Sequence, residues 1–296
     1  MTWLEQSRAL RATVPSADGL ARLGAELGEP VELVGPLHGG IASSVHHLRT
    51  PTRDLVLKRY LPDDEPPPIE QLEWERLQLM VDVPIPTPAP VALDTDGAWF
   101  GPAALVMSHL PGRVAYPPPV QSIARTMARL HDAALPDPVP EVLRRPGLWT
   151  RWEHVVPYPD GVVDAIAALP MIAEQSPHVL AHCDLHPGNV LVEDGEVTGV
   201  VDWSGVRLAP RGFDVALTRC DLALEPGGDA PARFLAAYEA ASGETVEHLP
   251  AWDCLAAARA IEWGAGWVEC WTDVGVAITV DQIRERATRF CEAALS

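Results

Sequence analysis

The 296-residue sequence predicts a two-lobed α+β fold, with a small β-rich N-terminal lobe and a larger helical C-terminal lobe. Two patterns predict it. The first hundred residues read as short strands around one helix, and the spacing of apolar residues becomes helical after residue 120. A short connection that contains Pro111-Gly112 separates the two patterns. We therefore expect lobes over residues 1–107 and 114–296, joined by residues 108–113.

The N-terminal lobe contains short apolar and β-branched runs that are bounded by turn residues. These runs predict strands over residues 31–37, 45–48, 54–60 and 103–107. A helix is expected over residues 69–81, because Leu72, Leu77 and Met80 recur at helical spacing.

The C-terminal lobe combines helices with a small β-rich segment. Helical spacing predicts helices over residues 120–133, 161–176, 251–271 and 281–295. Strands are expected over 179–183, 190–193 and 197–202, with a turn at Asp194-Gly195. Trp263, Trp267 and Trp271 recur at every fourth residue, and we expect this stripe to lie in the core.

Composition excludes several classes of function. The charge is 22 basic minus 41 acidic residues, or −19, which disfavours binding to nucleic acid and to an anionic membrane. The same charge favours a cationic small molecule or simply solubility. Five cysteines without a CxxC spacing indicate neither a disulfide scaffold nor a zinc ribbon, and they fit a reducing cytoplasm. The N-terminus lacks the apolar region of a signal peptide, and no run of 18 apolar residues predicts a membrane span. We therefore expect a cytoplasmic protein.

The most informative stretch is residues 180–192, which read LAHCDLHPGNVLV. Asp184 and Asn189 lie five residues apart across a Pro-Gly turn, and Asp202 follows an apolar run thirteen residues after Asn189. Mg²⁺ prefers such hard oxygen ligands and keeps phosphate oxygens in its shell. Asn189 and Asp202 are therefore candidate metal ligands, and Asp184 is a candidate acceptor of a proton from an attacking hydroxyl.

A second interpretation uses the histidines of the same stretch. His182, Asp184, His186 and Asp202 would form the site of a transition-metal hydrolase. This interpretation leaves Asn189 and Lys58, the single lysine of the chain, without a role.

The H-x-D-x-x-x-x-N…D pattern resembles the catalytic loop and metal-binding aspartate of protein kinases. The longer text HCDLHPGNVLV…VVDW resembles the aminoglycoside phosphotransferase and choline kinase family of small-molecule kinases. The resemblance covers roughly residues 31–220 and implies a protein-kinase-like fold. It departs from the family pattern at Cys183, where glycine is usual. Trp203-Ser204-Gly205 follows Asp202 where protein kinases have Phe-Gly, which suits small-molecule kinases better than protein kinases.

The resemblance implies ATP- and Mg²⁺-dependent transfer of the γ-phosphoryl group to a hydroxyl of a small molecule. Lys58 would contact the α- and β-phosphates, paired with Glu73 or, as the fallback, Glu75. His131 matches the helix before the catalytic region, and Asp214 matches the residue that braces the catalytic loop. The loop that covers the phosphates would include Gly39, Gly40, Ser43 and Ser44. The hinge, whose backbone reads adenine, would include Met107, Ser108 and Leu110.

The sequence leaves the acceptor open among aminoglycoside-like and other antibiotics, amino sugars and similar molecules. A cationic acceptor is expected, and GTP remains an alternative to ATP. The candidate carboxylates for such an acceptor, beside the tryptophan stripe, are Asp253, Glu262, Glu269 and Asp273. A nucleotide-binding pseudokinase is the third alternative, and the oligomeric state stays open.

Overall fold

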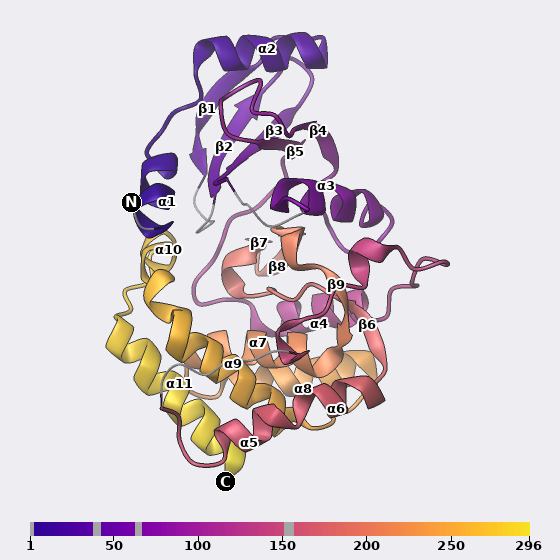
Figure 1. Cartoon of the computed structure of the whole chain (residues 1–296), viewed down its shortest axis with the longest axis vertical. Helices are drawn as coiled ribbons and strands as arrows, with labels where there is room; N and C mark the ends of the chain where they lie inside the picture. The colour runs from indigo at the N-terminus through magenta and orange to yellow at the C-terminus, as the bar shows by residue number, and fades with distance from the viewer. Residues whose placement is uncertain (1–2, 38–42, 63–66, 151–156) are drawn as a thin grey trace. The chain divides into compact units, whose positions relative to one another are not determined.

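The computed structural model describes residues 3–37, 43–62, 67–150 and 157–296 (Figure 1). The chain divides into two compact units. Unit 1 comprises Met1–Asp82 and Thr87–Leu110, and unit 2 comprises Val83–Pro86 and Pro111–Ser296. Unit 1 is built on a β-sheet and unit 2 is mainly helical, so the predicted α+β class is confirmed.

Unit 1 contains a five-stranded antiparallel sheet with the strand order β1-β2-β3-β5-β4. Its strands are β1 (Glu32–Leu37), β2 (Ser43–Arg49), β3 (Asp54–Tyr60), β4 (Pro90–Asp94) and β5 (Ala104–Ser108). The sequence analysis missed β4. This strand lies at the edge of the sheet and begins with Pro90, a position where the missing N–H costs little, but such a residue weakens the sequence signal.

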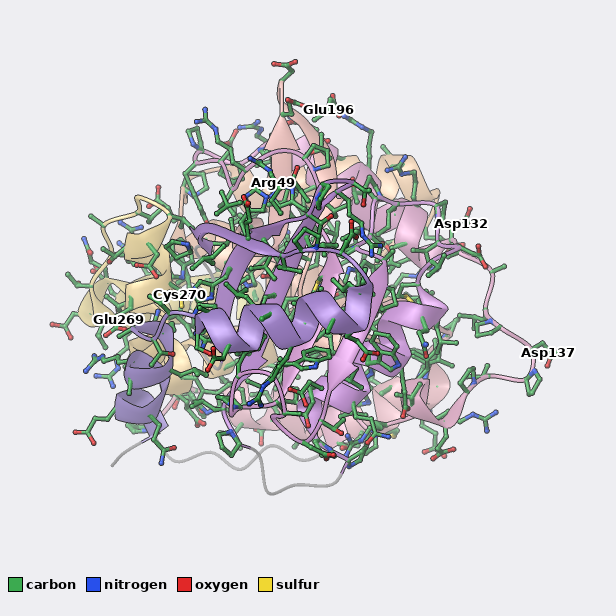
Figure 2. The ribbon with its side chains drawn as sticks, turned by 90° about the horizontal axis from the view of Figure 1, so that it is seen from above. Arg49, Asp132, Asp137, Glu196, Glu269 and Cys270 are labelled. Atoms are coloured by element: carbon green, nitrogen blue, oxygen red, sulfur yellow. The ribbon has the colours of Figure 1, made fainter. Side chains whose placement is uncertain are left out.

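Three helices accompany this sheet: α1 (Trp3–Arg11), α2 (Ala17–Leu27) and α3 (Ile69–Leu79). The first two were not predicted. The Ser16 side chain caps α2 by accepting a hydrogen bond from the Gly19 N–H, and α2 ends at Gly28 in the left-handed conformation. α2 lies across the sheet (Figure 2). Its Leu23 belongs to the same buried cluster as Leu48 and Leu55 of the sheet.

Unit 2 contains more helices than the sequence predicts. They are α4 (Val120–His131), α5 (Val162–Ala167), α6 (Leu169–Gln175), α7 (Arg211–Leu224), α8 (Ala230–Ser242), α9 (Leu249–Trp263), α10 (Val268–Asp273) and α11 (Val280–Leu295). The predicted helix 161–176 is divided into α5 and α6, because Pro170 starts a new helix.

The predicted helix 251–271 is also divided, into α9 and α10, by the 3₁₀ turn Gly264–Gly266. α9 and α11 lie side by side in Figure 1. At this turn the backbone passes so close to α11 that a Cβ atom on Gly264 would lie 2.5 Å from Ile283 Cγ2. Glycine is therefore required by packing, and it ends the helix.

Two short ladders lie within unit 2. β6 (His178–Ala181) pairs with β9 (Arg207–Pro210), and β7 (Val190–Glu193) forms the predicted hairpin with β8 (Glu196–Val200). β9 was not predicted. β6 and β8 end earlier than the predicted strands, which leaves Asp184 and Asp202 in loops just beyond them.

The hairpin is fixed at its turn and to α4. Asp194 and Gly195 have positive φ angles of 51° and 79°, the geometry that a tight hairpin turn requires. Glu196, labelled in Figure 2, accepts hydrogen bonds from Ser122 Oγ (2.7 Å) and Arg125 Nη2 (2.9 Å) on α4. Among the described residues, no helix combines the length and the apolar character needed to cross a membrane.

Candidate active site

In unit 1, the buried ammonium of Lys58 is paired with a carboxylate on α3. Lys58 Nζ donates to Glu73 Oε2 over 2.7 Å, and Tyr60 Oη donates to the same oxygen over 2.7 Å. Lys58 and Tyr60 share one face of the sheet because they are two residues apart on β3. Glu75 instead accepts a hydrogen bond from Gln71 on its own helix. The structure thus selects Glu73 over Glu75 as the partner of Lys58.

The residues predicted to cover the phosphates are only partly described. Gly39 and Gly40 lie outside the described residues. Ser43 pairs opposite Tyr60 and therefore shares the Lys58 face of the sheet. Ser44 lies on the other face, where its hydroxyl accepts a hydrogen bond from Arg59 Nη2 over 3.0 Å. The alternation of side chains along β2 thus separates the two serines.

The predicted hinge residues lie at and beyond the end of β5. Met107 is buried in the strand and pairs with Val56 of β3. The N–H of Ser108 donates to the Ala89 carbonyl, and its hydroxyl accepts a hydrogen bond from the Ala89 N–H, both over 2.8 Å. The Ser108 N–H and hydroxyl are thus both bonded to the residue that precedes β4. Leu110 follows the strand and belongs to no helix or strand.

In unit 2, Asp184 lies in the loop after β6 with its side chain about one third exposed (31%). Its Oδ1 accepts a hydrogen bond from Arg259 Nη2 over 2.6 Å. Its Oδ2 lies 3.4 Å from Asn189 Nδ2 and 3.8 Å from His186 Nε2. Burial alone would raise the pKa of Asp184, but the charges of Arg259 and His186 lower it below its ordinary value. The group is therefore an ionised carboxylate, the form in which it can accept a proton.

Asn189 and Asp202 are brought together by the backbone. The Asn189 amide nitrogen also donates to the Asp184 carbonyl (2.9 Å), and the Val201 N–H donates to the Asn189 carbonyl (3.0 Å). Asp202 has a positive φ of 64°, and its Oδ1 accepts a hydrogen bond from Ser204 Oγ over 2.8 Å. Because the Asn189 amide nitrogen faces Asp184, its amide oxygen is the atom suited to a cation. This donor set of amide and carboxylate oxygens fits Mg²⁺.

The backbone before Asp184 is held by a fully buried carboxylate on α7. Asp214 accepts hydrogen bonds from the N–H groups of His182 and Cys183, each over 2.9 Å, and from His131 Nε2 over 3.1 Å. Cys183 has a positive φ of 64°, a conformation in which a side chain is strained and glycine is not. This geometry explains why glycine is usual at the position in the resembling family.

His182 has a structural position in the same loop. Its Nε2–H donates to the Val201 carbonyl over 3.1 Å, and its ring packs on Trp203. Burial lowers the pKa of His182, against the charges of Asp214, Asp184 and Asp202, so the ring is neutral. Within the described ranges, no three His, Cys, Asp or Glu side chains are grouped to hold a metal ion. The hydrolase interpretation, which needs His182 as a ligand, therefore gains no support.

Sequence reasoning missed Arg259, the closest polar contact of Asp184. Arg259 lies on α9, 75 residues along the chain, and its guanidinium lies 5.0 Å from the centre of the Trp267 ring. Burial lowers its pKa, but Asp184 and Asp221 more than compensate and raise it. No motif marks this arginine, because only the packing of α9 brings it to the loop after β6.

The carboxylates expected to receive a cationic acceptor are placed differently. Asp253 is buried in an ion pair with Arg219 of α7 over 3.0 Å, and burial raises its pKa to about 6. Glu262 accepts a hydrogen bond from Tyr158. Contrary to the sequence prediction, the three residues of the tryptophan stripe do not all lie in the core. Trp263 is 44% exposed where α9 ends, whereas Trp271 is buried. Asp253 was thus a wrong prediction as a ligand for the acceptor, since its side chain is buried between α9 and α7.

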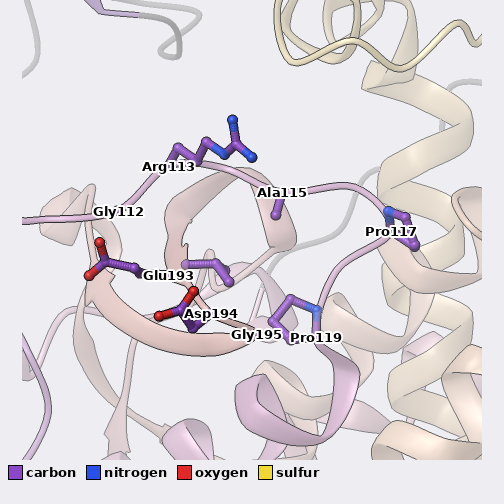
Figure 3. A pocket seen from close by; sticks show the side chains of 9 residues that line it. Gly112, Arg113, Ala115, Pro117, Pro119, Glu193, Asp194 and Gly195 are labelled. Atoms are coloured by element: carbon purple, nitrogen blue, oxygen red, sulfur yellow. The ribbon is translucent and has the colours of Figure 1, made fainter.

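A cavity of about 560 Å³ lies elsewhere in unit 2 (Figure 3). It is bordered by the segment after Pro111 and by the β7–β8 hairpin, which contributes Glu193 and Asp194. None of the predicted site residues lines it. The candidate residues therefore come from the contacts around Lys58 in unit 1 and, separately, from those around Asp184 in unit 2, and not from this cavity.

The model of the phosphotransferase enzyme family (APH) matches residues 34–258. No protein of curated function matches the sequence.

Several solved structures share the fold. A thermostable mutant of aminoglycoside phosphotransferase APH(4)-Ia, in complex with ADP and hygromycin B, has 16% identity and a TM-score of 0.63, covering 94% of this chain and 99% of that one. Ethanolamine kinase from Plasmodium vivax has 15% identity and a TM-score of 0.58, covering 93% and 85%. Macrolide 2′-phosphotransferase MphH from Brachybacterium faecium has 19% identity and a TM-score of 0.55, covering 94% and 98%.

At these identities the structural matches show the fold, and they confirm that it is kinase-like. The family match covers most of the chain and includes both Lys58 and Asp184. The chain therefore belongs to the phosphotransferase enzyme family.

Proposed function

We propose that this protein transfers the γ-phosphoryl group of ATP to a hydroxyl of a small molecule in a Mg²⁺-dependent reaction. The observation that carries the proposal is the ionised Asp184 carboxylate, held beside Asn189 on a backbone that Asp214 fixes. Asp184 orients the acceptor hydroxyl and takes its proton. Positioning and charge neutralisation supply most of the rate enhancement in phosphoryl transfer.

Asn189 and Asp202 would hold Mg²⁺, which neutralises charge on the phosphates when it is bound. Their oxygen donors suit this cation, and the hydrogen bond from the Val201 N–H to the Asn189 carbonyl keeps the two loops in register. Cys183, whose Sγ would attract softer metals, takes no part in this set and faces the Ala181 carbonyl.

Lys58 would bind the α- and β-phosphates, with Glu73 fixing the position of its ammonium. Of the two predicted serines, Ser43 is the better candidate for a phosphate contact because it shares the Lys58 face of the sheet. Relatives of the same fold were crystallised with ADP and with AMP-PNP, which supports an adenine nucleotide. GTP is the alternative donor, because contacts from a backbone do not fix the base.

We further propose a cationic acceptor, such as an aminated antibiotic or amino sugar. The net charge of −19 gives a field that attracts cations. Asp221 of α7 replaces Asp253 as the candidate carboxylate. It is only 7% exposed, and burial raises its pKa against the charges of His186 and Arg259. Because burial disfavours the charged carboxylate, a ligand ammonium would stabilise it.

The test is a screen for ADP release over aminoglycosides, macrolides, ethanolamine, choline and amino sugars, with EDTA and Asp184→Asn controls. We expect turnover with at least one amine-bearing alcohol, abolished by EDTA. Hydrolysis of esters with Zn²⁺ and no use of ATP would contradict the proposal.

The charge of the acceptor has a separate test. The acceptor KM should rise clearly between low ionic strength and about 0.5 M salt, where screening acts within a few ångströms. The KM for Mg-ATP should change less, because Lys58 is buried. An acceptor KM that does not respond to salt would contradict a cationic acceptor but not the kinase activity.

A further inference from the structure

The two oxygens of the Asp184 carboxylate have different surroundings. Oδ1 receives a short, charge-assisted hydrogen bond of 2.6 Å from Arg259 Nη2. Oδ2 has only longer contacts, to Asn189 at 3.4 Å and His186 at 3.8 Å. Rotation of the carboxylate would exchange the two oxygens, and the Arg259 contact opposes that rotation.

Arg259 is itself held in place, unlike an arginine on an open surface. Its side chain is 18% exposed, and α9 is anchored by buried residues on both sides of it, including Ala258 and Ala260. The guanidinium lies over the Trp267 ring at 5.0 Å, within the range of a cation–π contact. The buried Asp221 acts on its charge from α7. The arginine is therefore pre-organised, so that little entropy is lost when it orders the carboxylate.

We propose that Arg259 is a positioning residue for the phosphotransfer, holding Oδ1 of Asp184 so that Oδ2 receives the proton. This inference rests on the proposed function. As the acceptor oxygen forms its bond to the γ-phosphorus, its proton passes to Oδ2, and the bond from phosphorus to the β–γ bridging oxygen breaks with that electron pair leaving on ADP. Arg259 touches neither reactant and acts through Asp184.

Arg259 also limits where a positive group of the acceptor can bind. An ammonium would have to share Oδ1 with the guanidinium that already donates to it, at close range to a like charge. Asp221, which interacts with Arg259 only through its charge, stays the candidate carboxylate for that group. Binding of the acceptor and removal of its proton are thus assigned to two different carboxylates.

The test measures kcat and both KM values of Arg259→Ala and Arg259→Lys with the best acceptor of the screen. Arg289→Ala is the matched control, since Arg289 is 64% exposed and pairs only with Glu285 on its own helix in the described structure. We expect Arg259→Ala to lower kcat by tenfold to about a hundredfold, the cost of a misplaced catalytic group. Both KM values should stay within about threefold, and Arg289→Ala should be unchanged.

Guanidinium ion at tens of millimolar should restore part of the kcat of Arg259→Ala but not of Asp184→Asn. Arg259→Lys keeps the charge and one donor, so it should fold, and its kcat should lie between those of wild type and Arg259→Ala. If the alanine variant fails to fold, the lysine variant provides the test. A kcat of Arg259→Ala within threefold of wild type overturns the proposal. So does the absence of guanidinium rescue in a folded Arg259→Ala, or a rise in the acceptor KM alone. If the wild type itself transfers no phosphoryl group, the proposed function fails and this inference with it, whereas an active wild type beside a normal Arg259→Ala overturns the inference alone.

Discussion

Two ion pairs of nearly equal length have very different settings. Lys58 and Glu73 meet at 2.7 Å with side chains only 9% and 1% exposed, whereas Arg259 and Asp184 meet at 2.6 Å with 18% and 31% exposed. Removing one partner of a buried pair leaves a buried charge without compensation, at a cost of about 3–5 kcal/mol. Exposed pairs contribute about 0–1 kcal/mol, and a partly exposed pair lies between these two limits. The first pair is therefore a structural element of unit 1, and the second is retained for the chemistry of Asp184 more than for stability.

Asp184→Asn should have the largest effect, and on activity alone. Loss of the proton acceptor should reduce kcat by a factor of about 10²–10⁴. The affinity for Mg-ATP should stay within a few-fold, since the nucleotide contacts remain. Steady-state kinetics checks the loss of kcat, and a nucleotide-binding titration checks the affinity for Mg-ATP. Turnover within about tenfold of wild type would show that Asp184 is not the base.

Glu73→Ala should have the largest effect on stability. It takes the Glu73 carboxylate away from the buried Lys58 ammonium and from Tyr60 Oη, so we expect a loss of about 3 kcal/mol or more in the free energy of unfolding. Glu75→Ala is the matched control on the same helix and should cost about 1 kcal/mol or less. Arg259→Ala is the comparison from unit 2 and should cost less than Glu73→Ala, because its partner Asp184 is more exposed. Chemical denaturation measures all three. Equal losses would remove the distinction between the two pairs.

Lys58→Arg should have a smaller effect, although the charge is kept. The planar guanidinium does not fit the narrow site of an ammonium between β3 and α3, and it would displace Glu73. We expect kcat/KM to fall about tenfold or more, equivalent to about 1.4 kcal/mol. Normal kinetics of this variant would mean that the single lysine of the chain survives by chance.

The difference between the two pairs also explains what sequence could predict. Lys58 and Glu73 are 15 residues apart on successive elements. The family resemblance implies their pairing, and helical phase favours Glu73 over the fallback Glu75. Arg259 and Asp184 are 75 residues apart and meet only through the packing of α9. Two residues so far apart along the chain leave no local sequence pattern that marks them as neighbours in the fold.

The fold shows the same limit. Regular elements with clear periods, such as β3 and α4, were predicted to within two residues of their observed ends. The short strand β9 and the edge strand β4 were missed, because four or five residues with proline give little pattern. The break at Gly264 depends on its contact with Ile283 of α11, and the sequence of α9 alone does not reveal that contact.

The smallest effect concerns the backbone before Asp184. Cys183 has a φ of 64°, so its side chain is strained, yet its N–H is bonded to Asp214 and its sulfur is buried. Cys183→Ala removes the sulfur and keeps the strain, whereas Cys183→Gly removes both. Glycine is usually less stable than alanine by up to about 1 kcal/mol because its unfolded chain is more flexible. At a left-handed position the order reverses, since an L-residue there costs about 1–2 kcal/mol.

We therefore expect Cys183→Gly to be more stable than Cys183→Ala by roughly 1 kcal/mol, measured by denaturation of both variants. Because the Asp214 hydrogen bonds act on the backbone, both variants should keep the position of Asp184 and retain kcat within a few-fold. If alanine proves the more stable, the loop does not hold residue 183 in the left-handed conformation. The constraint that Asp214 places on the backbone before Asp184 would then be looser than its hydrogen bonds indicate. A large loss of kcat in both variants would instead mean that the sulfur, and not the backbone, supports the position of Asp184.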